Sequence, residues 1–269
     1  MLYDHVFLIG VDGAGNFFKD ADTPNLDYIR AHSSYAETFD AQTAFPTISA
    51  ECWGAMLLGV TPEMHGYNNG YISQEEHKRT GDVKYPSVFK LAREKYPQAR
   101  LVSYSDWNPI NIGIVEDDIG VEKETGSIID ITRYIINSIE SEEAPKLMFV
   151  QYDSVDGAGH HFGYGNKQYY NSISQIDAHL GIIWNTLRCK GLLSSTLLII
   201  TADHGGTPGG SHGGDTPAER TIYCGVFGDE IKGGPIGKMD VWDIPPIIGK
   251  ALNLSSSPEW VGKIPENIF

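Results

Sequence analysis

The sequence is short of cysteine, of basic residues and of long apolar runs, and each shortage excludes a class of protein. Its three cysteines cannot form a closed disulfide framework and lack the spacing of a zinc knuckle. No apolar run approaches the roughly 20 residues that cross a bilayer. The first residues also lack the basic region of a signal peptide. We therefore expect a cytoplasmic protein in a reducing compartment, with no membrane as partner.

The charge balance narrows the range of partners. The chain has 20 Lys and Arg against 35 Asp and Glu, a net charge of -15. Such a surface repels phosphate backbones and excludes a nucleic-acid scaffold. A small anionic substrate stays compatible, because a bound metal ion reverses the local field. The 269 residues, 41% hydrophobic and 20% charged, suit one globular domain over residues 1–269. The sequence is silent on the oligomeric state.

Apolar runs alternate along the chain with helical patterns. Strands are predicted over 6–11, 101–104, 147–152, 197–201 and 221–227. Helices are predicted from 24, from about 49, from 86, and over 128–139, 168–187 and 243–252. This alternation predicts a doubly wound, mostly parallel α/β sheet with helices on both faces. Residues 67–84 and 115–118 fit the pattern poorly and predict a small cap or insertion.

Acidic residues follow three of the apolar runs. Asp12 ends the first, Asp153 and Asp156 follow the run over 147–152, and Asp203-His204 follow the run over 197–201. Ligands of open α/β sheets gather at the carboxyl ends of the strands, so these side chains are expected to meet at one edge. Asp and His together suit Zn²⁺ or Mn²⁺.

Two more histidines could complete a metal site. His160 lies four residues after Asp156 with glycines between them, so that both could bend onto one cation. His212 lies eight residues beyond His204, after a Gly/Pro-rich loop. His161 is disfavoured because consecutive side chains diverge, and Asp153 competes with Asp156. The alternatives are polar surface loops with solvated histidines, and a turn-capping role for the acid that ends the first strand.

Ser49 begins a predicted helix, where the helix dipole favours an alkoxide and a bound phosphate. A metal ion would lower the pKa of this hydroxyl further. The alternative is a helix N-cap. Cys52 could act as a thiol nucleophile, but no Cys–His signature surrounds it and lone cysteines are commonly packed. A P-loop is absent, and the glycines after the first strand lack the third glycine of a dinucleotide fingerprint.

Taken in order, these segments resemble the alkaline phosphatase superfamily, in particular its nucleotide pyrophosphatase/phosphodiesterase branch. The resemblance covers nearly the whole chain and includes a closing segment over 243–262. It rests on Val-Asp-Gly at 11–13, Phe-Pro-Thr-Ile-Ser at 45–49, the segment over 58–66, Asp-Gly-Ala-Gly-His at 156–160, Asp-His-Gly at 203–205 and His-Gly-Gly at 212–214.

The resemblance implies a site for two divalent metal ions, with zinc favoured and manganese permitted. One ion would be held by Asp12, Asp203, His204 and Ser49. The other would be held by Asp156, His160 and His212.

The same resemblance implies a metal-dependent phosphoric ester hydrolase of the phosphodiesterase or nucleotide pyrophosphatase type. It would act on a small phosphate ester through a phosphoserine at Ser49. A threonine is common at this position in relatives, and an asparagine that donates to a phosphoryl oxygen is expected three residues later. Cys52 stands there instead, so we assign it and Trp53 as substrate-binding residues. Trp53, Tyr71 and Tyr164 are candidate pocket walls.

Three alternatives remain open. A phosphomonoesterase or a phosphotransferase of the same superfamily would use the same site, and the stretch over 212–217 resembles phosphoethanolamine transferases. A metal- or phosphate-ester-binding protein with decayed catalysis is favoured by Cys52 alone. The sulfatase branch is disfavoured because the residues after Ser49 lack the segment that matures to formylglycine.

Overall fold

A computed structural model describes residues 2–269 and shows one eight-stranded sheet in the order β4-β3-β5-β1-β6-β7-β2-β8. Its centre is formed by β1 (His5–Val11), β5 (Leu147–Tyr152) and β6 (Thr196–Ala202), which run parallel. Every residue of β5 and β6 is buried, as expected for strands covered on both faces. The remaining strands are β2 (Tyr35–Gln42), β3 (Leu101–Ser105), β4 (Glu122–Thr125), β7 (Thr221–Phe227) and β8 (Gly234–Pro235).

The sheet is mostly parallel, as predicted, but β7 runs antiparallel to both β6 and β2. The five predicted strands are confirmed, whereas β2, β4 and β8 were not predicted. The sequence of β2, Tyr-Ala-Glu-Thr-Phe-Asp-Ala-Gln, has no apolar run, and five of its eight residues are only partly buried. Its pairing with β7, about 185 residues away, makes it a strand, and a sequence pattern does not contain that partner.

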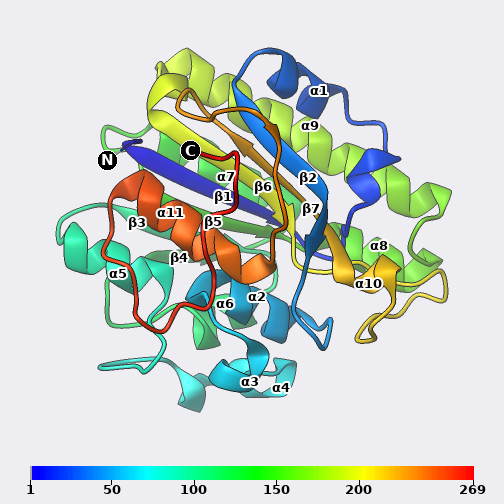
Figure 1. Cartoon of the computed structure of the whole chain (residues 1–269), viewed down its shortest axis with the longest axis horizontal. Helices are drawn as coiled ribbons and strands as arrows, with labels where there is room; N and C mark the ends of the chain where they lie inside the picture. Colours follow the sequence, from blue (N-terminus) through cyan, green and yellow to red (C-terminus); the bar gives the residue numbers. More distant parts are fainter. Residues whose placement is uncertain (1) are drawn as a thin grey trace.

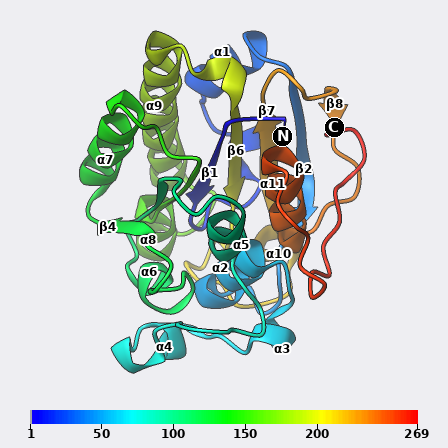
Figure 2. The same cartoon turned by 90° about the vertical axis from the view of Figure 1, so that its left-hand side faces the viewer.

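Helices cover both faces of the sheet, which confirms the doubly wound arrangement (Figure 2). One face carries α1 (Pro24–Ala31), α7 (Ile128–Glu140), α8 (Ser154–Phe162) and α9 (Lys167–Lys190). The other carries α2 (Ser49–Leu58), α5 (Val88–Lys95) and α11 (Ile244–Leu252). Short helices complete the chain: α3 (Pro62–His65), α4 (Asn69–Ile72), α6 (Pro109–Gly113) and α10 (Pro217–Arg220). Within residues 2–269, no helix combines the length and apolarity needed to cross a membrane.

The two segments that fit the sequence pattern poorly pack against each other below the sheet, around α3 and α4 (Figures 1 and 2). Their contact centres on a buried ion pair, with a nitrogen of Arg79 3.1 Å from Glu116. Glu116 is fully buried and also accepts a hydrogen bond from the backbone N–H of Ser87. A second nitrogen of Arg79 donates to the carbonyl of Ile114 at 2.7 Å. This pair therefore ties the two segments to each other, and the hydrogen bonds with Ser87 and Ile114 tie them to the main domain.

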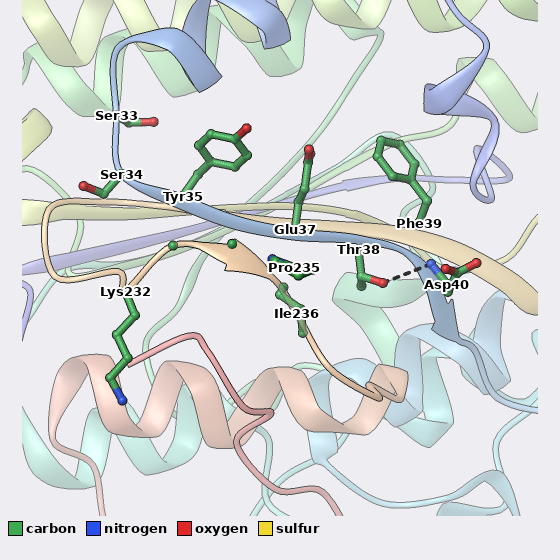
Figure 3. Close-up of a pocket in the computed structure, with 12 residues that line it drawn as sticks. Ser33, Ser34, Tyr35, Glu37, Thr38, Phe39, Asp40, Lys232, Pro235 and Ile236 are labelled. Atoms are coloured by element: carbon green, nitrogen blue, oxygen red, sulfur yellow. Dashed lines mark hydrogen bonds between the residues drawn. The ribbon is translucent and has the colours of Figure 1, made fainter.

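A cavity of about 730 Å³ lies at the end of the sheet where β2 pairs with β8, between β2 and the segment over 232–236 (Figure 3). Tyr35, Glu37 and Phe39 point to one side of β2, and Thr38 points to the other. None of the predicted site residues lines this cavity.

The buried ion pair generates a stability prediction. Glu116→Ala leaves the Arg79 guanidinium without its counter-ion, so we expect a loss of about 3 kcal/mol in the free energy of unfolding. Urea unfolding measures it. The control is Glu75→Ala, which removes an exposed ion pair to Lys78 and should cost less than about 1 kcal/mol. Equal losses in the two variants would contradict the anchoring role of Glu116.

Candidate metal centre

Three acidic residues meet where the central strands end, at the edge of the sheet beside α8 and α10 (Figure 1). Asp12 directly follows β1, Asp156 lies in the first turn of α8 after β5, and Asp203 directly follows β6. Asp12 and Asp203 are almost completely buried. The parallel order β5-β1-β6 thus brings together residues that lie up to 191 positions apart, Asp12 and Asp203.

A first donor group consists of Asp12, Asp203 and His204. The Nε2 of His204 lies 3.6 Å from Oδ1 of Asp12 and 3.4 Å from Oδ2 of Asp203. Both of these carboxylate oxygens are buried and have no hydrogen-bond partner. The three donor atoms lie within 4.8 Å of one another, a spacing that suits a single cation.

The other oxygen of each carboxylate is held firmly. Oδ2 of Asp12 accepts hydrogen bonds from the indole of Trp53 and the amide of Gln151, both at 2.9 Å. Oδ1 of Asp203 accepts from the backbone N–H groups of Gly13 and His204. Each carboxylate is therefore oriented through one oxygen, and its second oxygen is left for a cation.

The electrostatics agree with this geometry. Burial, and then repulsion from neighbouring carboxylates, raises the pKa of Asp12 well above its usual value. Burial likewise raises the pKa of Asp203, with repulsion from Asp156 adding to the effect. A buried carboxylate without a partner is costly, and a bound cation removes that cost. The donor set thus fits a divalent metal ion.

The predicted ligands Asp156, His160 and His212 are called the second donor group here. The donor atoms that lie within 4.8 Å of one another in this place are those of Asp156, His204 and His212. The Nε2 of His160 lies 3.1 Å from Oδ2 of Asp156 and 3.1 Å from Nε2 of His212. The Nδ1 of each histidine faces a carbonyl oxygen, that of Gly210 at 2.9 Å and that of Thr47 at 2.7 Å. A carbonyl at Nδ1 favours the tautomer whose Nε2 lone pair is free for a metal ion.

The first and the second donor group lie next to each other. The rings of His204 and His212 stack with their centroids 3.9 Å apart, and His204 also lies within ligand distance of Asp156 and His212. The structure therefore brings all six predicted Asp and His ligands into one cluster. Their role as ligands remains a prediction.

The segment with Asp156 and His160 is helical, so the polar-loop alternative is wrong. It forms α8, and the spacing of four residues places both side chains on one helix face. Its glycines are not needed for a bend. Gly159 makes room for a neighbour, since a Cβ there would lie 2.4 Å from the ring of Tyr164, whereas a Cβ on Gly157 would meet no atom within 4 Å.

Ser49 is the first residue of α2, and its Oγ lies 3.3 Å from Nε2 of His204. The N-cap alternative is wrong, because the N-cap position is occupied by Ile48. The hydroxyl of Ser49 thus faces the first donor group at the start of a helix, as the sequence predicted for a nucleophile.

Neither predicted substrate contact is exposed. Cys52 is fully buried, with Sγ 3.8 Å from the carbonyls of Ala44 and Pro46. Trp53 is also fully buried, beneath the carboxylate of Asp12. A substrate contact by either one is untested, and in this structure both lie under the site. Of the other candidate walls, Tyr71 is 39% exposed and Tyr164 is 2% exposed.

Asn69 is a candidate site residue that the sequence reasoning missed. It lies at the start of α4, and its Oδ1 accepts a hydrogen bond from the backbone N–H of Ala50, next to Ser49. Asn69 is exposed, and its amide nitrogen makes no hydrogen bond within residues 2–269. Because the residue lies 20 positions after Ser49 on a separate helix, no local pattern indicated it.

Comparison with known proteins gives evidence on the family of the chain that does not depend on the geometry of the site. Residues 6–216 match the family model described as Type I phosphodiesterase / nucleotide pyrophosphatase. The chain is 23% identical over 227 residues to GPI ethanolamine phosphate transferase 2 of Aspergillus fumigatus, covering 81% of this chain and 29% of that protein. It is 23% identical over 234 residues to ectonucleotide pyrophosphatase/phosphodiesterase family member 7 of Mus musculus, covering 75% and 50%. The chain spans half or less of these relatives.

Solved structures share the fold. An inactive variant of murine ectonucleotide pyrophosphatase / phosphodiesterase 5, in complex with AMP, superposes with a TM-score of 0.77 at 13% identity, covering 95% of this chain and 96% of that one. A 2-O GAG sulfatase superposes with a TM-score of 0.75 at 11% identity, covering 97% and 73%. The predicted alkaline phosphatase-like fold is confirmed.

Because the carboxylate of Asp12 has an unpaired buried oxygen, replacing it should raise the stability of the metal-free protein and lower the stabilisation by Zn²⁺. Asp12→Asn removes a repelled buried charge, so the metal-free variant should unfold at a higher temperature than the metal-free wild type. Zn²⁺ should stabilise the wild type by about 2.7 kcal/mol per site at 100 times its Kd, and should stabilise the variant less. Thermal unfolding with and without Zn²⁺ measures both effects. Asp229→Asn, at an exposed position, should change neither.

The carboxyl group of Glu51 should make the stability of the fold depend on pH. Burial raises the pKa of Glu51 to about 7, and one of its carboxylate oxygens is buried without a partner. Because the folded chain holds this proton more tightly than the unfolded chain, Glu51 stabilises the fold below the unfolded pKa, near 4.5. That stability is lost as the pH rises through about 7.

Metal-free Glu51→Gln should therefore lose less stability than the wild type between pH 5 and pH 8, as read from urea midpoints at each pH. The exposed Glu94→Gln serves as the matched control and should follow the wild type. Parallel pH profiles for wild type and Glu51→Gln would refute the assignment.

Proposed function

Because the chain belongs to the type I phosphodiesterase / nucleotide pyrophosphatase family of the alkaline phosphatase superfamily, we propose that it hydrolyses small phosphoric esters, with a preference for diesters. The observation that carries the proposal is the placement of Ser49 Oγ 3.3 Å from Nε2 of His204, beside two buried carboxylate oxygens without partners. A nucleophile and a cation site thus adjoin. A cytoplasmic location remains part of the proposal.

Two divalent ions would be held by the two donor groups, with Ser49 completing the first. Mixed Asp and His ligands favour Zn²⁺ and permit Mn²⁺. When bound, such ions supply the positive charge that stabilises the attacking and leaving oxygens of an in-line displacement. A chain of net charge -15 requires such a source of positive charge to bind a phosphate ester.

The covalent chemistry falls to Ser49. Its Oγ forms a bond to phosphorus while the bond from phosphorus to the leaving alcohol breaks, and the proton of Ser49 ends on that alcohol. Water then attacks phosphorus, the bond to Oγ breaks, and a proton from water returns to Ser49. The start of α2 favours the negative charge that develops on Oγ.

Asn69 supplies a phosphoryl contact that Cys52 cannot. The hydrogen bond from Ala50 holds its side-chain oxygen, which leaves the amide N–H₂ group free to donate to a phosphoryl oxygen at Ser49. An amide is a good donor to a phosphoryl oxygen, whereas a thiol is a weak one and the Sγ of Cys52 is buried. The substitution of cysteine at position 52 therefore does not argue for decayed catalysis.

A phosphotransferase is the second candidate. The match to GPI ethanolamine phosphate transferase 2 favours it, since that relative is named for the transfer of such a group. Transfer and hydrolysis share the step at Ser49 and differ in the acceptor, an alcohol or water. Product analysis in the presence of an added alcohol separates them, because a transferase yields the new ester.

The test is the hydrolysis of bis-p-nitrophenyl phosphate against p-nitrophenyl phosphate after loading with Zn²⁺ or Mn²⁺. We expect a diester preference and a loss of at least about 10³-fold in kcat for Ser49→Ala. Acid-quenched mass spectrometry should show a phosphoryl adduct on Ser49 in the wild type. Ser194→Ala, at an exposed position before β6, should keep full turnover.

The results of this test distinguish the proposed phosphodiesterase from its alternatives. A monoester preference would move the protein to the phosphatase branch. A metal-loaded protein that binds both esters without turnover would contradict catalysis and favour the binding-protein alternative.

A further inference from the structure

Tyr164 lies directly beneath the second donor group and is not one of its ligands. Its hydroxyl donates to Oδ1 of Asp156 at 2.5 Å. Its ring makes edge-on contacts with the rings of His160 and His212, at centroid distances of 6.0 and 6.4 Å. One buried side chain thus touches all three residues of the group.

The backbone around Tyr164 is arranged to hold this ring. Gly163 and Gly165, on either side of it, have φ values of +90° and +81°, which other residues rarely adopt. A Cβ on Gly159 or Gly206 would lie 2.4 or 2.5 Å from the ring. Glycines on two separate segments therefore leave the space that the ring fills.

The contact to Asp156 has a chemical consequence. Helix α8 fixes where the backbone of Asp156 lies, but not the rotation of its carboxylate. The phenol holds Oδ1, while Oδ2 faces His160 at 3.1 Å. Donors that orient a ligating carboxylate commonly change metal affinity 10- to 100-fold when they are removed.

We propose that Tyr164 is a positioning residue that sets the metal affinity of the Asp156, His160 and His212 group. The inference rests on the metal site of the proposed function. Tyr164 acts through Asp156 and through the two histidine rings, and it does not touch the reacting atoms.

The test is competition for Zn²⁺ between the metal-free protein and a chromophoric chelator. The wild type should show two binding steps. Tyr164→Phe, which keeps the ring and removes the hydroxyl, should weaken one step by about 10- to 100-fold and leave the other unchanged. Tyr223→Phe is the matched control, since it removes a buried phenol that donates to the carboxylate of Glu37 and should change neither step.

A pair of glycine variants keeps the test independent of the hydroxyl. Gly159→Ala pushes a methyl group into the ring of Tyr164, and it should weaken the same step. Gly157→Ala lies in the same helix with no atom within 4 Å of the added group, and it should not. Two unchanged steps in Tyr164→Phe, or an equal weakening of both steps, would overturn the proposal, as would equal effects of the two alanines.

The competition with the chelator measures metal binding and not catalytic turnover. Failure of the proposed function would show separately, as a protein that binds two ions and hydrolyses no phosphate ester. A wild type that binds no Zn²⁺ would overturn the inference together with the metal site.

Discussion

Two buried carboxylates, Asp12 and Asp203, form the constraint on which the rest of the site depends. Each is fixed through one oxygen by two donors, and each presents its other oxygen, buried and without a partner, toward His204. Two such charges in a desolvated space repel each other, and their raised pKa values express that cost. A cation between the two carboxylates would remove that cost.

The fold brings the residues of the candidate site together from both faces of the sheet. The parallel strands β1, β5 and β6 deliver acids to one edge, and α2 brings the hydroxyl of Ser49 to the same place from the opposite face. Thr47 joins the two halves, because its carbonyl meets Nδ1 of His212 and its hydroxyl bonds the backbone of Gly213 and Gly214. The segment that carries Ser49 and the loop that carries His212, more than 160 residues apart, are thereby held together.

Much of this could be predicted from the sequence, because the central strands are unbroken apolar runs and the acids follow them directly. The runs over 6–11, 147–152 and 197–201 need no tertiary information to be recognised as buried strands. The polar edge strand β2 could not be found in this way, because its partner lies in β7. Helix α8 was not predicted, because its glycines have low helix propensity, and the packing of Tyr164 requires one of them, Gly159. Asn69 was missed because the insertion, which carries no periodic pattern, brings it to the backbone of Ala50.

The central claim is that two cations occupy two distinct donor groups, and a crystal structure of the Zn²⁺-loaded protein with anomalous scattering at the zinc edge tests it most directly. The account predicts two anomalous peaks, one among Asp12, Asp203, His204 and Ser49, and the other among Asp156, His160 and His212. A single peak shared through His204, the residue that lies within ligand distance of both groups, would contradict it.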